Sequence, residues 1–369
     1  MWTWTWKSLV AQRAGSLGGA CGIAGAFVLV IFFDAVWRGE SEQIVTYVRE
    51  MDADVWVMQR GVANMHMASS FVWDWKADAI AAMPGVSRVT PILYLNSVYH
   101  VNDRRSFGYV VGLQPGSARA GPWELTAGRT VAASGEAVIP AELARLAGTR
   151  LGDPVTIADR RLAVVGLSAG TYSAANTIIF VAMADLEDML SLAGAYSFLL
   201  VDAGEGVDAG ALAGRIRSDV DKVNALTQEE FIRNDFAMAM QMGVEIILLM
   251  TVISGVLAAL IVAFTASSLV MRGRRELAVA KALGATNRSV LAAVVLQATA
   301  VTVVGCAMAI AFALFVMPWI PMLVPQLTLA LSMAAAARVA AIALFVAVAG
   351  AILPGALVAA VDPATAFHR

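Results

Sequence analysis

Two long apolar runs separated by a short cationic loop constrain the fold of this chain more than any other feature. The runs cover residues 244–270 and 290–317, and each exceeds the roughly 20 apolar residues that cross a bilayer as a helix. The loop 272–290 between them carries five basic residues and one acid: Arg272, Arg274, Arg275, Lys281, Arg288 and Glu276. Since basic residues concentrate in short cytoplasmic loops, these runs predict two membrane helices joined on the cytoplasmic side.

The loop itself predicts a short amphipathic helix. Leu277, Ala280, Lys281 and Gly284 recur at helical spacing within it. A helix held between two membrane helices is well placed to receive a force from a cytoplasmic partner.

Two further apolar runs, residues 17–33 and 334–353, bring the number of predicted membrane helices to four. The chain has 369 residues, of which 59% are hydrophobic and only 15% charged, with a mean hydropathy of +0.72. Soluble domains carry about 25% charged residues, so the composition also indicates a membrane protein. The first run has the length of a secretory signal peptide, but no A-x-A-like cleavage site follows it, which favours a retained helix.

The amino-terminal segment is expected in the cytoplasm. Lys7 and Arg13 precede the first apolar run, and Trp2, Trp4 and Trp6 suit a membrane interface. With four crossings, both termini are then cytoplasmic.

Four glycines of the first run are spaced four apart in two pairs, Gly15 with Gly19 and Gly18 with Gly22. Small residues at this spacing let helix backbones approach closely in lipid, so these positions are candidates for packing between membrane helices. The alternative is that glycine is simply frequent in membrane helices.

The long polar middle of the chain predicts an α+β domain outside the cytoplasm. Residues 38–242 contain 24 acidic and 17 basic side chains, a balance that does not suggest nucleic-acid binding. Helical and strand patterns mix there without strict alternation. The expected helices are 40–51, 78–83, 141–147, 183–192, 207–220 and 224–241, and the expected strands are 53–57, 86–98, 106–113, 137–139, 152–157, 161–167, 177–181 and 198–201.

The predicted fold class is therefore a membrane α-helical protein of four transmembrane helices with a large inserted α+β extracytoplasmic domain. Its expected parts are residues 1–37 (amino terminus and first membrane helix), 38–242 (the inserted domain), 243–361 (three membrane helices with the loop 272–290) and 362–369 (a cytoplasmic tail). A short outer loop is expected at residues 318–331.

The sequence contains no catalytic motif. The phosphate-binding G-x-x-x-x-G-K-[ST] pattern, HExxH, GxSxG and CxxC are all absent from it, so no catalytic residue and no bound cofactor or metal are expected. Met thioethers with His66 in the stretch 64–67 are able to bind copper(I). Because residues 56–75 are rich in Met and aromatic side chains, packing or contact with an apolar ligand is the favoured interpretation. No ionisable residue lies at mid-bilayer, which disfavours an ion-coupled transporter.

The segment RRELAVAKALGA, residues 274–285, resembles the cytoplasmic motif of FtsX/MacB-like ABC transporter permeases. The segment LPGALVAAVDPATAFHR, residues 353–369, is similar to the carboxy-terminal ending of the same family. In the middle, GLQPG, Gly128-Arg129, EAVIPAELARLAGTRLGDPVTI and LAVVGL follow in the order seen in the MacB-like periplasmic domain. There, a small β-barrel-like half is joined to a mixed α/β half.

The resemblance implies a non-catalytic permease subunit of the bacterial inner membrane, served by a separate ATPase chain that holds ATP and magnesium. The residues that match the motif would dock on that ATPase: Arg274, Arg275, Glu276, Lys281, Ala282, Gly284 and Ala285. The charged residues would set the register, and the small ones would allow close approach. The alternative, that the basic residues only anchor the loop at the membrane, explains neither Glu276 nor the small residues.

The family's behaviour is mechanical transmission. Two copies of the chain, or one copy with a related permease, would pair with two ATPase subunits. ATP-driven movement would then shift the periplasmic domain to export or extract a lipid, lipoprotein or peptide, with a periplasmic adaptor or lipoprotein as a possible partner. The main rival is a transmembrane regulator that activates a periplasmic cell-wall hydrolase, and a third interpretation is a membrane-anchored sensor without an ATPase.

Overall fold

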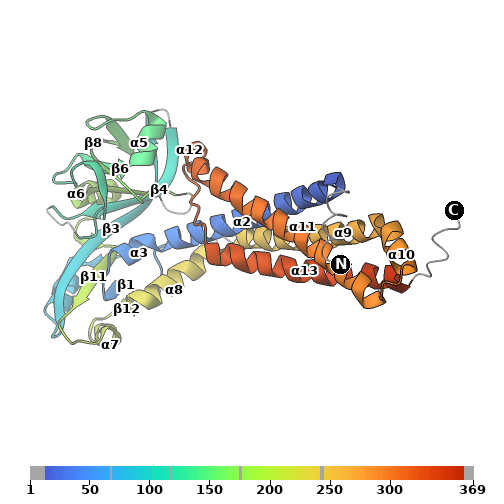
Figure 1. The fold of residues 1–369 in the computed structure, drawn as a ribbon. Coiled ribbons are helices and arrows are strands. Elements are labelled where there is room, and N and C mark those ends of the chain that lie inside the picture. The colour runs from blue at the N-terminus through green and yellow to red at the C-terminus, as the bar shows by residue number, and fades with distance from the viewer. Residues whose placement is uncertain are drawn as a thin grey trace. The chain divides into compact units, whose positions relative to one another are not determined.

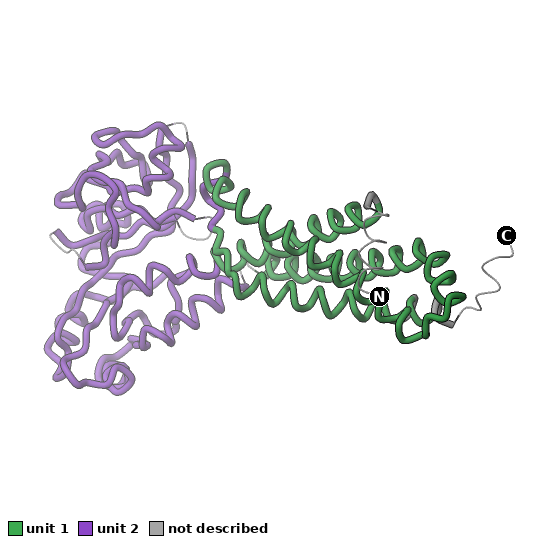
Figure 2. Tube along the Cα trace, viewed as in Figure 1, with its two compact units in different colours: residues 1–39, 245–323, 329–369 green, residues 40–244, 324–328 purple. Residues whose placement is uncertain are grey.

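The computed structural model describes residues 13–66, 69–102, 104–115, 119–173, 177–241 and 245–360 (Figure 1). The chain folds into two compact units (Figure 2). The first unit comprises residues 1–39, 245–323 and 329–369, and the second comprises 40–244 and 324–328. The predicted tail 362–369 and the interfacial residues Trp2, Trp4, Trp6 and Lys7 lie outside the described residues.

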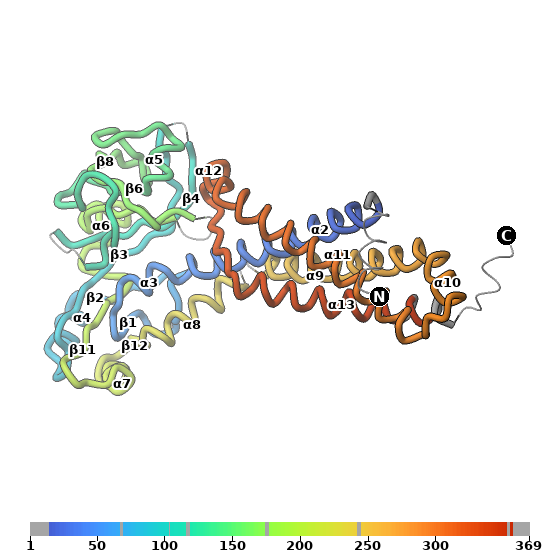
Figure 3. Tube along the Cα trace, viewed as in Figure 1, coloured from blue at the N-terminus to red at the C-terminus, as the bar shows by residue number. Residues whose placement is uncertain are grey.

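Four helices among the described residues are long and apolar enough to cross a membrane, which confirms the predicted number. They are α2 (Arg13–Ile44), α9 (Glu245–Arg272), α11 (Asn287–Val316) and α13 (Met333–Ala360). Figure 3 shows α9, α11 and α13 side by side in the first unit. The first helix continues well beyond the apolar run 17–33, and the boundary between the two units falls within it.

The predicted outer loop 318–331 is partly wrong. Its first residues form a 3-10 turn, Met317–Trp319, and a short helix, α12 (Ile320–Leu323). Pro318 lies in the first turn, where a missing backbone N–H breaks no helical hydrogen bond.

The second unit is built on a ten-stranded sheet. The strands of the unit are β1 (Val55–Gln59), β2 (Val72–Trp73), β3 (Val86–Val101), β4 (Arg104–Leu113), β5 (Leu125–Gly128), β6 (Glu136–Pro140), β7 (Pro154–Ile157), β8 (Arg160–Ser168), β9 (Ile178–Ala182), β10 (Ala195–Tyr196), β11 (Phe198–Ala203) and β12 (Val223–Thr227). The order along the sheet is β12-β1-β11-β3-β4-β9-β6-β8-β5, and β7 pairs with both β3 and β8. Strands β2 and β10 form a separate antiparallel pair.

The 16-residue strand β3 belongs to both halves of this unit. With its second half it closes a ring of six strands, β3-β4-β9-β6-β8-β7, so that the sheet curls into a small barrel. Helices α5 (Ala141–Ala147) and α6 (Met183–Leu190) contribute Leu143 and Leu186 to the apolar core of this half.

The other half is a four-stranded antiparallel sheet, β12-β1-β11-β3, with helices on both faces. Strand β1 explains the two layers, because its side chains alternate between faces. Val55 and Val57 pack with Ile80 of α4 (Asp74–Ala81) and Leu212 of α7 (Ala209–Asp219). The residues between and after them, Trp56 and Met58, pack with α3 (Thr46–Glu50) and α8 (Gln228–Ala239). The predicted α+β class is confirmed.

The helix predicted at residues 224–241 is wrong at its beginning. Val223–Thr227 forms β12, which pairs with β1. Helix α8 begins only at Gln228, because the Thr227 side chain accepts from the Glu230 N–H and the Glu230 carboxylate accepts from the Thr227 N–H. The short strands β2, β5 and β10 were also not predicted.

Candidate functional site

The cationic loop folds into a short helix, α10 (Arg274–Ala282), between α9 and α11. Leu277 is buried there in one apolar cluster with Val270 of α9, Val290 of α11 and Ala351 of α13. Ala278 beside it is also buried. One face of α10 is therefore fixed against the membrane helices of the first unit, so that the orientation of its other face is determined.

Helix α10 ends in a Schellman motif centred on Gly284. The N–H of Gly284 donates to the carbonyl of Lys281 at 2.9 Å, and the N–H of Ala285 donates to the carbonyl of Ala280 at 3.0 Å. Gly284 adopts a φ of 96°, which is strained for residues with a Cβ. This glycine is therefore explained by helix termination, whereas the sequence had suggested a role in close approach to a partner.

The free face of α10 mixes charged and apolar side chains. Arg274, Arg275 and Glu276 are exposed. Val279 is 40% exposed and Leu283, one turn further on, is 84% exposed. Neither apolar residue was singled out from the sequence, although their i, i+4 spacing places them on one face. Among the remaining motif residues, Ala282 and Gly284 are exposed, and Lys281 and Ala285 are half-buried.

Three of the four candidate packing glycines face α9. A Cβ added to Gly19 would lie 2.7 Å from Thr265 Cγ2, and one added to Gly15 would lie 2.7 Å from Arg272 Nη1. At Gly22 the nearest atom, Ile261 Cγ2, would be 3.9 Å away. Gly18 has no such neighbour within 4 Å among the described residues. Close backbone approach thus depends most on Gly19, where the neighbour is a short side chain.

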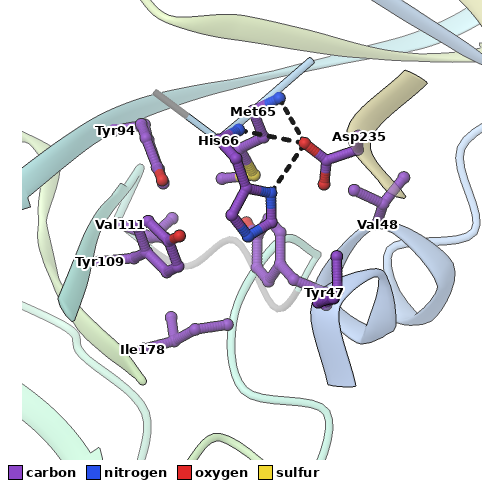
Figure 4. A pocket seen from close by; sticks show the side chains of 10 residues that line it. Tyr47, Val48, Met65, His66, Tyr94, Tyr109, Val111, Ile178 and Asp235 are labelled. Carbon is purple, nitrogen blue, oxygen red and sulfur yellow. Dashed lines mark hydrogen bonds and ion pairs between the residues drawn. The ribbon is translucent and has the colours of Figure 1, made fainter. Parts of the chain in front are cut away.

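Two of the residues considered for copper, Met65 and His66, line a small buried pocket of the second unit (Figure 4). Asp235 Oδ1 accepts three hydrogen bonds, from the N–H of Met65 at 2.8 Å, from the N–H of His66 at 3.0 Å and from His66 Nδ1 at 2.8 Å. The Nδ1 proton is assigned from this contact with the carboxylate. His66 Nε2 and Asp235 Oδ2 are buried, and neither has a hydrogen-bond partner among the described residues.

The rest of this pocket is apolar and aromatic. Tyr94 and Tyr109 lie on one side with their rings stacked 5.3 Å apart. Burial, assisted by the charge of Asp235, raises the pKa of Tyr109 far above its ordinary value, so its hydroxyl stays protonated. In the described part of the chain, no group of three or more His, Cys, Asp or Glu side chains is arranged so that it could hold a metal ion. Met67 lies outside the described residues, and Met65 packs in the core.

Two family models match the chain in succession. Residues 17–219 match the MacB-like periplasmic core domain, and residues 248–363 match the FtsX-like permease C-terminal domain. Together they cover both units that the structure contains.

Relatives that align with most of this chain occur in Mycobacterium tuberculosis. One uncharacterized ABC transporter permease is 24% identical over 342 residues, which cover 92% of this chain and 92% of that protein. A second is 25% identical over 329 residues, covering 87% of this chain and 86% of that protein.

Two solved structures are similar to part of the chain. The periplasmic region of MacB from Actinobacillus actinomycetemcomitans has 12% identity and a TM-score of 0.38, covering 50% of this chain and 94% of that one. The extracellular domain of the transporter YknZ from Gram-positive bacteria has 12% identity and a TM-score of 0.36, covering 48% and 100%.

The matched models take up more than half of the chain, in the order that its sequence motifs predict. The chain therefore belongs to the FtsX/MacB-like ABC transporter permeases, as a multi-pass membrane protein with a MacB-like periplasmic domain.

Proposed function

We propose that this permease couples ATP hydrolysis by a separate ATPase chain to movement of its periplasmic domain, and that α10 is the element on which the ATPase acts. The observation that carries the proposal is the free face of α10. Leu283 has 84% of its surface exposed in a loop that also presents Arg274, Arg275 and Glu276. An exposed leucine framed by charges is typical of a docking surface with an apolar centre and a polar rim.

Membrane anchoring alone explains less of this helix. The preference of basic residues for the cytoplasm accounts for Arg274 and Arg275. It does not account for the carboxylate of Glu276 or for the exposed Leu283, because that preference concerns only basic side chains. A partner that covers Leu283 removes this apolar surface from water.

Movement of α10 would pass to the periplasmic side through the chain connections. Its buried face packs with α9, α11 and α13, so that a push on α10 is transmitted to three membrane helices together. Helix α9 follows α8 of the second unit in the chain, and α2 contributes residues to both units. The cargo of such a machine would be a lipid, a lipoprotein or a peptide handled on the outer side. Two copies, or one copy with a related permease, would work with two ATPase chains in the inner membrane.

The substitution Leu283→Asp tests the docking role with little effect on the packing of the described chain, since 84% of this side chain is exposed. The tagged full-length chain is recovered from host membranes, and the co-purifying chain with a G-x-x-x-x-G-K-[ST] motif is measured by mass spectrometry together with ATP hydrolysis. We expect a loss of about tenfold or more in both, which corresponds to about 1.4 kcal/mol or more of binding free energy.

The matched control is Leu323→Asp in α12, because Leu323 is 83% exposed and belongs to a different loop. It should leave ATPase recovery unchanged. Gly284→Trp is unsuited to this test, because its positive φ would strain any other residue whether or not an ATPase binds. Full ATPase recovery with Leu283→Asp would refute docking through α10.

A further inference from the structure

The aromatic and Met-rich stretch 56–75 divides into two parts with opposite environments. Trp56, Met58 and Met65 are buried in the core of the second unit. Phe71, Trp73 and Trp75 are 41%, 46% and 59% exposed. The first part meets the expectation of packing. The second part, which we call the aromatic row, leaves three large rings in solvent.

The backbone of the aromatic row is fixed by contacts that do not involve its rings. The N–H of Phe71 donates to Gln59 Oε1 at 3.2 Å, and Trp73 pairs with Ala195 across β2 and β10. Val72 between them is buried, so strand alternation turns Phe71 and Trp73 to the same outer face. Trp75 follows in the first turn of α4. Rings held on a fixed backbone and left exposed are typical of contact surfaces rather than of folding determinants.

The surroundings of the aromatic row are acidic. Burial raises the pKa of the Tyr196 hydroxyl on β10, and the carboxylates of Asp74, Glu187 and Asp78 raise it further. Two of these carboxylates contact the backbone beside β2 and β10, because Asp74 Oδ1 accepts from the N–H of Trp75 at 2.7 Å and Glu187 Oε1 accepts from the N–H of Gly194 at 3.5 Å. The one lysine of α4, Lys76, is turned inward, where its Nζ donates to the backbone carbonyl of Asp221 at 2.6 Å. Lys76 Nζ nevertheless lies 5.2 Å from the centroid of the Trp75 ring, so three carboxylates and one lysine lie near the row, and the negative charges among these groups outnumber the positive one.

We propose that the aromatic row is a docking surface for a basic peptide segment that also carries apolar side chains. The rings of Phe71, Trp73 and Trp75 supply apolar area and cation–π faces, and the carboxylates of Asp74, Asp78 and Glu187 supply the opposite charge. The Trp75 ring already attracts a cation within the chain, since Lys76 Nζ lies 5.2 Å from its centroid.

The acidic charge near the aromatic row distinguishes between the kinds of molecule that could dock there. Bacterial phospholipid surfaces and nucleic acids are anionic, and both would be repelled by the three carboxylates. A cationic peptide gains from the same groups. The proposal concerns the second unit alone, so it stands or falls independently of the docking of α10 on an ATPase.

The experiment uses the full-length chain in nanodiscs of zwitterionic lipid, with empty nanodiscs subtracted. The probe is the fluorescein-labelled peptide Lys-Leu-Lys-Leu-Lys, compared with Glu-Leu-Glu-Leu-Glu by fluorescence anisotropy at low and high salt. We expect only the lysine peptide to bind, and more weakly as salt rises. The double variant Trp73→Ala with Trp75→Ala should weaken binding about tenfold or more, as for aromatic residues at the centre of an interface.

Two further variants make the result specific. Asp78→Asn with Glu187→Gln should remove most of the salt dependence while retaining the rings. Phe107→Ala is the matched control, because Phe107 is an aromatic residue of β4 that is 62% exposed outside the row. It should bind the peptide as the wild type does. Thermal unfolding midpoints verify that each variant is folded.

Several outcomes would overturn the proposal. These are equal binding of the two peptides, absence of binding by the lysine peptide, or undiminished binding by the folded Trp73→Ala/Trp75→Ala variant. Retention of a chitin oligosaccharide or of anionic vesicles at the row in place of the lysine peptide would assign it to a sugar or to a membrane surface instead.

Discussion

The two units of this permease place the same kinds of residue in opposite positions. In the first unit Phe264, Phe315 and Phe345 are 74%, 72% and 73% exposed, whereas alanine is the commonest residue at the buried positions. In the second unit several large rings form the core, where Trp56 stacks on Phe231 with centroids 4.8 Å apart. The difference shows that solvent, and not residue type, decides which side chains form a core.

Lipid and water favour different ways of holding helices and strands together. Between membrane helices there is little hydrophobic driving force, so contacts depend on close approach of small residues. Gly305 of α11 illustrates this, because a Cβ there would lie 2.7 Å from Ile23 Cγ2 of α2. In water each buried aromatic ring removes a large apolar area from solvent, so size stabilises the second unit.

Buried polar groups follow the same division. In the first unit Thr302 is buried, and its hydroxyl donates to the carbonyl of Ala298 one turn earlier on the same helix. In the second unit Asp235 of α8 reaches His66, 169 residues away in the chain. Thr302 is thus satisfied within its own helix, whereas Asp235 connects elements that are distant in the chain.

The largest expected effect comes from removing the distant contact. Asp235→Ala leaves the N–H groups of Met65 and His66 and the His66 ring buried without their acceptor. Breaking a buried charged contact of this kind costs about 3–5 kcal/mol in the free energy of unfolding. Urea unfolding of the full-length chain in mild detergent, followed by tryptophan fluorescence, measures this loss.

The matched control is Asp221→Ala in the same unit. The Asp221 carboxylate meets Arg60 at 3.7 Å, and both side chains are mostly exposed, so the change is expected to cost about 1 kcal/mol or less. Equal effects of the two variants would contradict the view that the buried contact stabilises the periplasmic domain.

A smaller effect is expected where small residues hold the membrane helices. Gly305→Ala places a methyl group 2.7 Å from Ile23 Cγ2 and 3.0 Å from the carbonyl oxygen of Ala20, so α2 or α11 must shift. Overpacking of this kind costs about 1–3 kcal/mol. The loss is measured by denaturation in increasing sodium dodecyl sulfate, which acts on membrane helices.

Gly255→Ala in α9 serves as the control for that variant. A Cβ at Gly255 meets nothing within 4 Å among the described residues, so no helix has to move. Its stability should equal or exceed that of the wild type, because alanine is a better helix former than glycine. If both alanine variants were equally stable, close approach at Gly305 would not contribute to packing.

The sequence predicts some levels of this architecture much better than others. The four membrane helices follow from apolar length alone, and the α+β class from strand and helix periods. The faces of the membrane helices do not, since Phe264 and Ala263 differ in exposure through helix packing and not through hydropathy. The prediction of a helix from residue 224 missed the start of α8, although the sequence contains a signal for it. Thr227 and Glu230 form a T-x-x-E capping box. The contact between His66 and Asp235 had no local signal.

The candidate coupling site shows the same limit. Basic residues and helical spacing are sufficient to predict a short helix near residue 277. The roles of single residues depend on the end of that helix and on its packed face. Gly284 terminates α10 through its positive φ, and Leu283 is left exposed, whereas Leu277 occupies the packed face. The motif identifies the family, whereas the geometry identifies which residue to substitute.

The smallest expected effect concerns a surface ion pair of the periplasmic domain and appears as a dependence on pH. Glu136 accepts hydrogen bonds from the Arg129 guanidinium and from the N–H groups of Ala132 and Ala133, which lower its pKa from 4.5 to about 2. Because this pKa is lower in the folded chain, the contact stabilises the fold above pH 4.5 and is lost as the pH falls toward 2.

Glu136→Gln should therefore be less stable than the wild type at neutral pH, by less than the two losses above, since Arg129 is largely exposed. The gap should close as the pH falls from 4.5 to about 2, because the wild-type carboxyl is then protonated as well. Glu205→Gln, at an exposed position of the same unit, is the control. The midpoints of urea unfolding of the wild type and both variants, measured across this pH range, test this expectation. If the stability difference between Glu136→Gln and the wild type stayed constant across this pH range, Glu136 would act through the shape of its side chain and not through its charge. This position of the periplasmic domain would then resemble the membrane helices, in which the shapes of side chains determine packing.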